Sequence, residues 1–592
     1  MGSSHCHWLV LGLLIGCAEK APTASDSASA DTGEAPWRPD VVCPGDPDCP
    51  DADGALHAGA AAVSITPTCF EGWLDCGDDG LCPGDEGYTE ADGGEGDAEY
   101  DRYTEAFLDC GCDRLCPEDE GYQSADDGEG DGEFQAMWLA GFQNGRPANS
   151  VHDEMWARAV AFRKGSTTLA IVALDVVGFF FDDVLKVRAA LELRGVDVDH
   201  VIVSSTHVHE APDTLGQWGP GSGVRGVNDE WFAQVIANTA DAVEQAVGRL
   251  EPATLTVGAA DISLDSADKG TQNQVDDHRD PRIVDQWIGW ALLQDASGGT
   301  IASLVNYGNH PEALADENTA ITSDFVHYVR DGMENGAPWE SGAVDGLGGV
   351  CVYVQGAVGG MMTPLGVTVT DWDGNDFSER DFDKSKALGH VMASIVLSDI
   401  PSGTVVSDPG LALRASQIYL PIENSAFQAA FIIGLFDRGA HNYDDTLRVE
   451  EGNIPELLSE VDVLDIGPIR MLSIPGELLP ELAIGGYDGS RTNIGASTDQ
   501  IVSPDNPNPP DLTAAPAGPY IKDRMGAEHS WILGLGNDEV GYIIPQYNFK
   551  LHDTNPWFDE AEGDHYEETN SLGPNTAPLL ETAIDRLLDW SP

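Results

Sequence analysis

The order of apolar strands and helices from residue 150 onward constrains the fold more than any other feature of this sequence. Residues 183–194 and 228–250 carry apolar side chains at helical spacing, and the second segment begins at an Asn-Asp cap and ends near Gly248. Short apolar runs rich in β-branched residues lie between such segments. The alternation predicts an α/β protein in which a layered mixed sheet is flanked by helices.

Polar residues follow several of the predicted strands at the points where these strands end. The strands at residues 200–206, 300–307, 349–354 and 469–474 run into segments that contain His207, His209, His310, Glu312, Glu477 and the stretch QGAVGGMMTP. Tyr542 follows Asn-Asp-Glu in a further segment of this kind, GLGNDEVGYIIP. Ligand sites of open α/β sheets lie beyond the carboxyl ends of the strands, so the pattern predicts that these groups line one cleft.

The stretch SSTHVHEAPD holds two histidines two residues apart. Side chains alternate along a strand, so His207 and His209 are expected to project to the same side. Two imidazoles that face one space indicate a metal or proton-transfer site. The alternative is a solvated loop with two incidental histidines, because an isolated motif of this length is weak.

The acidic composition limits the partners of this protein. The chain has 101 acidic and 29 basic residues, which gives a formal charge of -72 over 592 residues. Contact with nucleic acid or with an anionic bilayer surface is therefore not expected unless cations bridge the two. Beyond the N-terminus the sequence has no apolar run of about eighteen residues, so the chain is not expected to span a membrane.

The N-terminus MGSSHCHWLVLGLLIGCAEK resembles the signal peptide of a bacterial lipoprotein. Its Leu-Ile-Gly-Cys sequence matches a lipobox, which implies cleavage before Cys17 and a lipid on this cysteine. The segment lacks the usual Lys or Arg, and a buried helix would give a similar apolar run. Residues 1–17 are thus predicted to be a signal peptide and residues 18–55 a flexible tether. The protein is expected to be exported and lipid-anchored to a bacterial membrane, in the cell envelope.

Residues 69–135 form an acidic, cysteine-rich loop module inserted into the α/β pattern. The sequence of residues 73–100 recurs at residues 107–134, so the module is duplicated. Carboxylates among glycines favour Ca²⁺ binding, although their spacing is not that of an EF-hand loop. The alternative is a solvated acidic loop held by disulfides.

Cysteine usage favours export. Eight of the eleven cysteines crowd into residues 43–116 without paired CxxC units, which predicts disulfides rather than a zinc ribbon. Cys351 lies within an apolar strand and is predicted to be a buried free thiol.

Together, these motifs resemble the N-terminal catalytic domain of the neutral/alkaline non-lysosomal ceramidases. The resemblance runs through SITP, Gly145-Arg146, STHVHEAPDT, NYGNHPEAL, SDF, QGAVGG, SIPGE and GLGNDEVGY to HYEETNSLGP. It covers residues 56–592 apart from the acidic module, and the order of the motifs makes it fairly specific.

The resemblance implies one zinc ion (Zn²⁺) bound by two histidines, a glutamate and a tyrosine. By motif, these ligands are His207, His310, Glu477 and Tyr542. The resemblance also places His209 and Tyr566 as catalytic residues that face a lipid-like small-molecule substrate. Taken singly, Glu477 could instead cap the following helix, Tyr542 could be strand packing, and His310 could be a turn residue.

Two departures from the family bear on the mechanism. The family's serine nucleophile follows an Asn or Asp, whereas here the nearest hydroxyl is that of Thr363, after a Gly-Met-Met sequence. Thr363 is therefore the candidate nucleophile, and direct attack by zinc-activated water is the alternative. The family's substrate-contacting arginine has no clear counterpart, and Arg279 and Arg282 are the candidates.

Asp175 and Asp324 lie where apolar strands meet loops. Each could orient a ligand histidine, but capping a turn is the commoner role for such aspartates and is the interpretation favoured here.

The predicted function is that of a zinc-dependent amidohydrolase, which cleaves an amide (N-acyl) bond in a sphingolipid-like substrate. The alternative from another class is a surface calcium-binding or adhesion protein on a catalytically inactive ceramidase-like scaffold. The acidic repeats and the altered loop at Thr363 favour that alternative. A third interpretation keeps the enzyme and replaces the amide by an ester or a peptide bond. The sequence does not indicate an oligomeric state.

Overall fold

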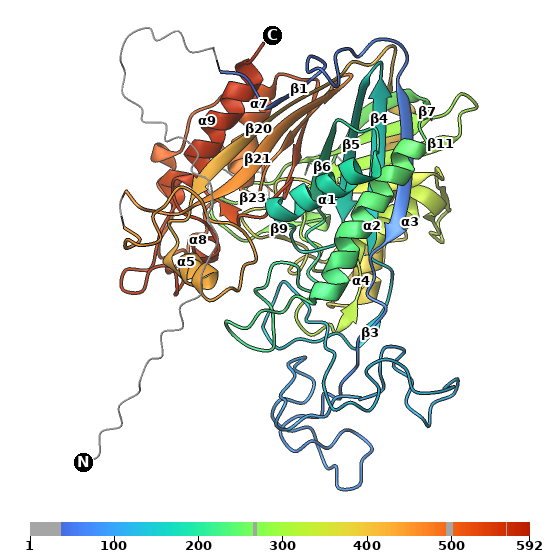
Figure 1. Ribbon diagram of the computed structural model, residues 1–592, viewed down its shortest axis with the longest axis vertical. Helices are drawn as coiled ribbons and strands as arrows, with labels where there is room; N and C mark the ends of the chain where they lie inside the picture. Colours follow the sequence, from blue (N-terminus) through green and yellow to red (C-terminus); the bar gives the residue numbers. More distant parts are fainter. Residues whose placement is uncertain (1–36, 264–268, 451, 493–500, 564, 592) are drawn as a thin grey trace. The chain divides into compact units, whose positions relative to one another are not determined.

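Three five-stranded sheets form the framework of the protein (Figure 1). The computed structural model describes residues 37–263, 269–450, 452–492, 501–563 and 565–591. The first sheet has the order β1 (Val41–Cys43), β20 (Leu411–Pro421), β21 (Glu456–Ile466), β22 (Ile469–Ser473) and β24 (His529–Leu533). The second has the order β6 (His200–Ser205), β5 (Thr167–Leu174), β4 (Trp156–Lys164), β2 (His57–Ser64) and β7 (Glu251–Pro252). The third has the order β15 (Val350–Gln355), β11 (Thr300–Tyr307), β10 (Trp287–Gln294), β8 (Thr254–Asp261) and β19 (Thr404–Val406).

Short ribbons and helices complete the fold. The two-stranded pairs are β3 (Ser150–Val151) with β12 (Ala320–Ile321), β9 (Asp276–Asp277) with β16 (Met362–Thr363), β13 (Gly336–Ala337) with β14 (Val344–Asp345), β17 (Val369–Thr370) with β18 (Asp376–Phe377), and β23 (Glu477–Leu478) with β25 (Tyr542–Ile543). The α-helices are α1 (Phe181–Arg194), α2 (Asp229–Gly248), α3 (Asp324–Asn335), α4 (Phe382–Asp399), α5 (Ser425–Ile432), α6 (Pro480–Ile484), α7 (Ile521–Met525), α8 (Tyr566–Thr569) and α9 (Thr576–Asp589).

The three sheets share one apolar core, and helices cover their outer faces. Ile202 of β6, Leu304 of β11 and Met471 of β22 belong to a single buried cluster. Helices α1 and α2 pack over the second sheet, α3 and α4 over the third, and α9 over β20 and β21, as Figure 1 shows. Strand β5 is buried at all of its eight residues. Burial on both faces is why this strand is a continuous apolar run rather than an alternating one.

Parallel pairing brings strand ends from all three sheets together. Strands β5 and β6, β11 and β15, and β22 and β24 are parallel pairs, so each pair presents two carboxyl ends at one edge. Buried amides tie these edges to one another. The Asn537 Oδ1 accepts the backbone N–H of Val203 in β6 at 2.9 Å, and the Asn306 Nδ2 in β11 donates to the Ile532 carbonyl of β24 at 2.8 Å. The polar segments that follow the strands therefore converge.

The structure confirms the predicted α/β class and the main predicted elements. The predicted strand at residues 300–307 is β11, and the predicted helices correspond to α1 and α2. The Asn228 side chain caps α2 by accepting the backbone N–H of Trp231 at 3.0 Å. Cys351 is a buried free thiol, as predicted. No helix among the described residues has the length and apolar character needed to cross a membrane.

The predicted N-terminal segments fall largely outside the described residues, which begin at residue 37. This applies to the signal peptide at residues 1–17 and to the first half of the tether at residues 18–55. The tether was predicted too long, because Val41–Cys43 form β1 and pair antiparallel with β20. The tether was predicted from the preceding Ser/Thr/Ala stretch, which has no helical or strand periodicity. The short apolar run at Val41–Cys43 differs from that stretch.

The acidic module connects β2 to β3, and four disulfides stabilise the N-terminal part of the described chain. The disulfides are Cys43–Cys49, Cys69–Cys112, Cys76–Cys82 and Cys110–Cys116. The first disulfide precedes the module, and the Cys69–Cys112 disulfide joins residues of its two halves. An antiparallel bridge between Trp73 and Phe107 links the two copies directly. Disulfides at this density fit an exported protein.

The repeated acids of the module bind its backbone. Glu71 lies two residues before the first copy, and Glu105 lies two residues before the second. Each glutamate contacts the backbone of the copy that it does not precede. The Glu71 carboxylate accepts the N–H of Gly111, and the Glu105 carboxylate accepts the N–H of Gly77. Equivalent aspartates also match: Asp75 accepts the N–H groups of Gly96 and Ala98, and Asp109 those of Gly130 and Gly132. These carboxylates have a structural role, and Ca²⁺ binding by the module remains a prediction.

We expect the Cys69→Ser/Cys112→Ser variant to loosen the module more than the Cys76→Ser/Cys82→Ser variant. The first pair closes a loop with a sequence separation of 43 residues and the second a loop with a separation of 6. Loop-closure entropy then predicts losses of about 4 and about 2 kcal/mol. Cleavage by a glutamate-specific protease under native conditions measures the difference. Equal cleavage rates in the two variants would contradict this ranking.

Candidate metal centre

A left-handed turn places the first histidine of the centre. Strand β6 ends at Ser205, and His207 has φ 66°, a backbone conformation that is uncommon outside glycine. The expectation that strand alternation aligns His207 with His209 is therefore wrong, because the strand stops before both. The turn itself brings the two imidazoles together. Strain of this kind costs on the order of 1–3 kcal/mol and clusters at functional sites.

Backbone carbonyls fix the orientation of two imidazoles. The Nδ1 of His207 lies 2.6 Å from the Val177 carbonyl oxygen, and the Nδ1 of His310 lies 2.8 Å from that of Met362. A carbonyl only accepts hydrogen bonds, so each Nδ1 carries a hydrogen and each Nε2 is the nitrogen available to a metal. Both Nε2 atoms point at the Glu477 carboxylate, whose Oε2 is 3.5 Å from His207 and 3.1 Å from His310.

Glu477 lies in a short strand rather than at a helix cap. It begins β23, its N–H donates to the Gly541 carbonyl at 3.1 Å, and it is opposite Tyr542 in the parallel register with β25. Helix α6 begins three residues later, with Leu479 at its N-cap. The interpretation of Glu477 as a helix cap is therefore wrong.

The histidines and Glu477 shift one another's pKa. Burial alone would lower the pKa of His207, but the Glu477 carboxylate outweighs it and raises this pKa to about 9. Burial would raise the pKa of Glu477, yet His207 and His310 hold it far below its usual range. Glu477 is thus an anion among imidazoles at neutral pH, which is the charge that a divalent cation requires of a ligand.

The two predicted tyrosines occupy the same region in different ways. Tyr542 is buried, and its hydroxyl donates to the Sδ of Met361 at 3.3 Å. Tyr566 begins α8 and is 45% exposed, with its ring centroid 6.2 Å from that of Tyr542. Tyr566 therefore lies near the solvent, where it can contact a bound molecule, and Tyr542 lies deeper beside Glu477.

His209 contacts both a second histidine and a buried acid. Its Nε2 lies 3.4 Å from the Nε2 of His207, and its Nδ1 lies 3.2 Å from the Oε2 of Glu312. Burial lowers the pKa of His209 to about 4, so this imidazole is neutral at pH 7. The strand-end pattern placed Glu312 in the cleft, but no role in the centre was predicted for it. Its signal was its position two residues after His310 in the same polar segment.

Thr363 lies behind the centre rather than in the open cleft. It is 1% exposed, belongs to β16, and is paired with Asp276 of β9. Its side chain hydrogen-bonds the Glu312 carboxylate, and its Oγ1 accepts the Leu365 N–H at 3.1 Å. Thr363 is not among the residues that line the cleft.

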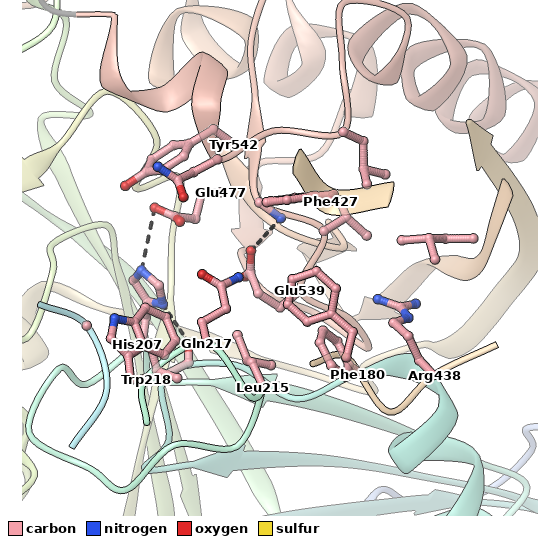
Figure 2. A pocket seen from close by; sticks show the side chains of 18 of the residues that line it. Phe180, His207, Leu215, Gln217, Trp218, Phe427, Arg438, Glu477, Glu539 and Tyr542 are labelled. Carbon is pink, nitrogen blue, oxygen red and sulfur yellow. Dashed lines mark hydrogen bonds and ion pairs between the residues drawn. The ribbon is translucent and has the colours of Figure 1, made fainter. Parts of the chain in front are cut away.

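An apolar cleft extends from the histidines. His207, His209, Glu477, Tyr542 and Tyr566 line one end of it. Its other walls come mainly from β-strand ends and from α5, and they are formed by Val177, Phe180, Leu215, Phe427, Phe431 and Phe436. Figure 2 shows His207 and Glu477 on one side of this space and Phe180, Leu215 and Phe427 on the other. The cleft can hold an apolar chain next to a polar centre.

The arginine of the cleft is Arg438, which the sequence analysis did not identify. Its guanidinium binds both oxygens of Asp538, at 2.9 and 2.8 Å, and lies over the Phe180 ring. Neither predicted candidate lines the cleft. Arg279 is buried in ion pairs with Glu567 and Glu568, and Arg282 lies 3.6 Å from Asp280.

Two other clusters of ligand-type residues are unsuited to a metal. Cys43 and Cys49, which lie near Asp199, form a disulfide and have no free thiolate. His200, Glu460 and Asp462 are buried together, but the Arg188 guanidinium reaches the Nε2 of His200 at 3.1 Å and also binds Glu460. The Arg188 guanidinium therefore supplies the positive charge that a metal ion would otherwise bring to this cluster.

Asp175 and Asp324 anchor backbone and side chains near the strand ends. Asp175 accepts the N–H of Trp156 and pairs with buried Arg330 at 2.8 Å. Asp324, with φ 50°, accepts hydrogen bonds from the Phe325 backbone and the Ser385 hydroxyl. Neither aspartate contacts a ligand histidine, and Asp175 joins distant segments instead of capping a turn, which was the role favoured from the sequence.

Asp324 makes the stability of the fold depend on pH. Burial raises the pKa of this carboxyl to about 7, although hydrogen bonds from Phe325 and Ser385 oppose the shift. Between about pH 4 and pH 7 the folded state keeps a proton that the unfolded chain has lost, so the free energy of unfolding falls as pH rises.

We expect Asp324→Asn to remove this dependence, since Asn tolerates the same backbone conformation. The free energy of unfolding of the wild type, relative to that of the variant, should then be lower at pH 7.5 than at pH 4 by on the order of 2–4 kcal/mol. Urea unfolding at the two pH values measures it. An unchanged difference would show that Asp324 titrates normally.

The fold and this centre define a class of protein with three mixed sheets, in which histidines and a carboxylate gather at strand ends beside an apolar cleft. Among solved structures the chain is similar to neutral ceramidase from Pseudomonas aeruginosa, with 14% identity and a TM-score of 0.53 over 90% of this chain and 74% of that one. A structure described as ceramidase complexed with C2 is similar at 13% identity and a TM-score of 0.51, over 90% and 75% of the two chains. No family model and no curated protein matches the sequence. At these identities the likeness shows a shared fold.

Proposed function

We propose that this protein is a zinc-dependent amidohydrolase of the ceramidase type, which cleaves an N-acyl bond in a sphingolipid-like substrate. The observation that supports it most is the buried cluster of His207, His310 and Glu477 at the end of an apolar cleft. Two imidazoles and a carboxylate are ligands that zinc prefers. When bound, zinc would polarise an amide carbonyl and lower the pKa of a water molecule to about 7.

The residues of the cleft suit a neutral lipid amide. Phe180, Phe427 and Leu215 offer apolar walls that would hold an acyl or alkyl chain and exclude water. Arg438 is the guanidinium on the cleft wall, and Asp538 neutralises it through two hydrogen bonds. The cleft therefore offers an anionic headgroup little attraction. Tyr566 at the solvent side would contact the polar part of the substrate.

Water is the nucleophile that fits the cleft better than Thr363. The Thr363 hydroxyl is buried, is held by Glu312, and does not line the space that a substrate would fill. A threonine nucleophile would need direct access to the carbonyl carbon at about 3 Å.

The first test is the release of fatty acid from a labelled ceramide by the purified protein. We expect His207→Ala to lower kcat/KM at least about a hundredfold, because removing a ligand should cost at least as much as removing its supporting partner. His57→Ala is the matched control, since His57 is half-buried at the opposite end of its sheet. Chelation should abolish the activity and zinc should restore it. Equal rates for His207→Ala and wild type would end the proposal.

The role of Thr363 is tested by Thr363→Val, which keeps the shape of the side chain. We expect turnover within about tenfold of wild type and no burst of product, because loss of a true nucleophile costs more than about 10⁴-fold. A loss of that size in a variant with an unchanged circular dichroism spectrum would make Thr363 the nucleophile.

Export and lipid anchoring belong to the same proposal. Cys17 would carry the lipid, and residues 18–38 would tether the catalytic part to a bacterial membrane that supplies the substrate. The support is the lipobox-like sequence together with the four disulfides.

A further inference from the structure

Three imidazoles, rather than two, converge on one point. Ring nitrogens of His207, His209 and His310 all lie within 4.8 Å of one another. Bonds of about 2.0–2.1 Å in a tetrahedral shell put two ligand atoms about 3.3–3.4 Å apart. The Nε2 atoms of His207 and His209 are 3.4 Å apart, and the Glu477 Oε2 lies 3.5 and 3.1 Å from the Nε2 atoms of His207 and His310. The 3.4 Å between the Nε2 atoms of His209 and His207 is thus the separation expected of two ligands in one shell.

Each of the three imidazoles has an acceptor behind it. The Nδ1 of His207 and that of His310 face carbonyl oxygens, and the Nδ1 of His209 faces the Glu312 carboxylate at 3.2 Å. A carbonyl at Nδ1 selects the tautomer with the hydrogen there, and the Glu312 carboxylate favours the same tautomer of His209 electrostatically, although their contact lacks hydrogen-bond geometry. The Nε2 atoms of His207 and His209 face each other, and those of His207 and His310 face the Glu477 carboxylate. A divalent cation among these atoms would accept the imidazole lone pairs and neutralise the carboxylate.

The backbone around His209 holds its ring in place. The Arg146 guanidinium binds the His209 carbonyl and pairs with buried Glu210 at 3.3 Å. The His209 ring packs against the Cα of Gly141, where a Cβ would stand 2.4 Å from the ring. His209 is therefore a pre-positioned group rather than a mobile one that swings toward a substrate.

Tyr542 is less well placed to bind the same ion. Its hydroxyl donates to the Met361 Sδ at 3.3 Å, and Met361 itself has a left-handed backbone with φ 56°. The Met361 thioether therefore binds the Tyr542 hydroxyl, which is the group that would bind zinc according to the resemblance to the ceramidases.

We propose that His209 is a third imidazole ligand of the metal and that Glu312 is the residue that positions it. The centre is then His207, His209, His310 and Glu477, and it differs from the two-histidine, glutamate and tyrosine set of the ceramidases. The inference rests on the metal site of the proposed function but not on its substrate. Glu312 acts through His209 by fixing its tautomer and ring orientation, as carboxylates behind zinc-bound histidines do.

X-ray absorption of the zinc-loaded full-length protein counts the imidazoles, and competition with a chromophoric chelator gives the zinc Kd. We expect three imidazoles in wild type and two in His209→Ala, with the Kd raised at least about a hundredfold. Glu312→Gln keeps the size of the side chain and should raise the Kd about 10- to 100-fold. Tyr542→Phe should leave both the imidazole count and the Kd unchanged.

The control is His57→Ala, and circular dichroism checks that each variant is folded. Two imidazoles in wild type, or a Kd that rises in Tyr542→Phe and not in His209→Ala, would overturn the inference. If His209→Ala does not fold, the imidazole count in wild type and the Kd of Glu312→Gln still decide. Fatty acid release is measured separately. If three imidazoles bind zinc but the protein does not cleave ceramide, the proposed substrate is wrong and the inference stands. If the protein cleaves ceramide but only two imidazoles bind zinc, the inference is wrong and the proposed substrate stands.

Discussion

The interaction on which the site depends is the convergence of imidazoles on a buried carboxylate. Glu477 is 5% exposed, and an isolated carboxylate in such a place would be costly unless it were paired. His207 and His310 supply the partners, and carbonyls behind their rings hold them in the necessary orientation. Positive φ values at His207, Met361 and Asn537 show that the surrounding loops are strained to achieve this. The three packed sheets are what hold these loops in strained conformations.

The sheets matter to the site because of how their strands are paired. One parallel pair in each sheet ends at the same region, so loops more than a hundred residues apart in sequence meet there. Buried amides such as Asn306 and Asn537 connect the sheets through backbone groups at these ends. Their hydrogen bonds satisfy polar groups that the convergence of strand ends would otherwise leave buried and unpaired. The geometry of the centre is therefore a property of the whole framework rather than of any one segment.

A shared fold at 14% identity is compatible with a centre that differs in detail. Burial selects for apolar character at strand positions, and many sequences meet that requirement. The chemistry of a site depends instead on a few side chains, and folds host different chemistries by changing them. Here Glu312 and Met361 are such side chains, since one contacts His209 and the other contacts Tyr542. The acidic module, which binds its own backbone through repeated carboxylates, is a further addition to the framework.

The sequence by itself determined the local elements and the approximate place of the site. The apolar run of β11, the Asn228 cap of α2 and the duplicated module are patterns among near neighbours, and the rule about strand ends brought His207, His310 and Glu477 together. It did not determine the contact of His209 with Glu312, the hydroxyl of Tyr542 on Met361, or the pairing of Arg438 with Asp538. It also missed the pairing of Val41–Cys43 with β20. These depend on sheet register and on left-handed turns such as that at His207, which join residues distant in sequence and leave no periodic pattern in the chain.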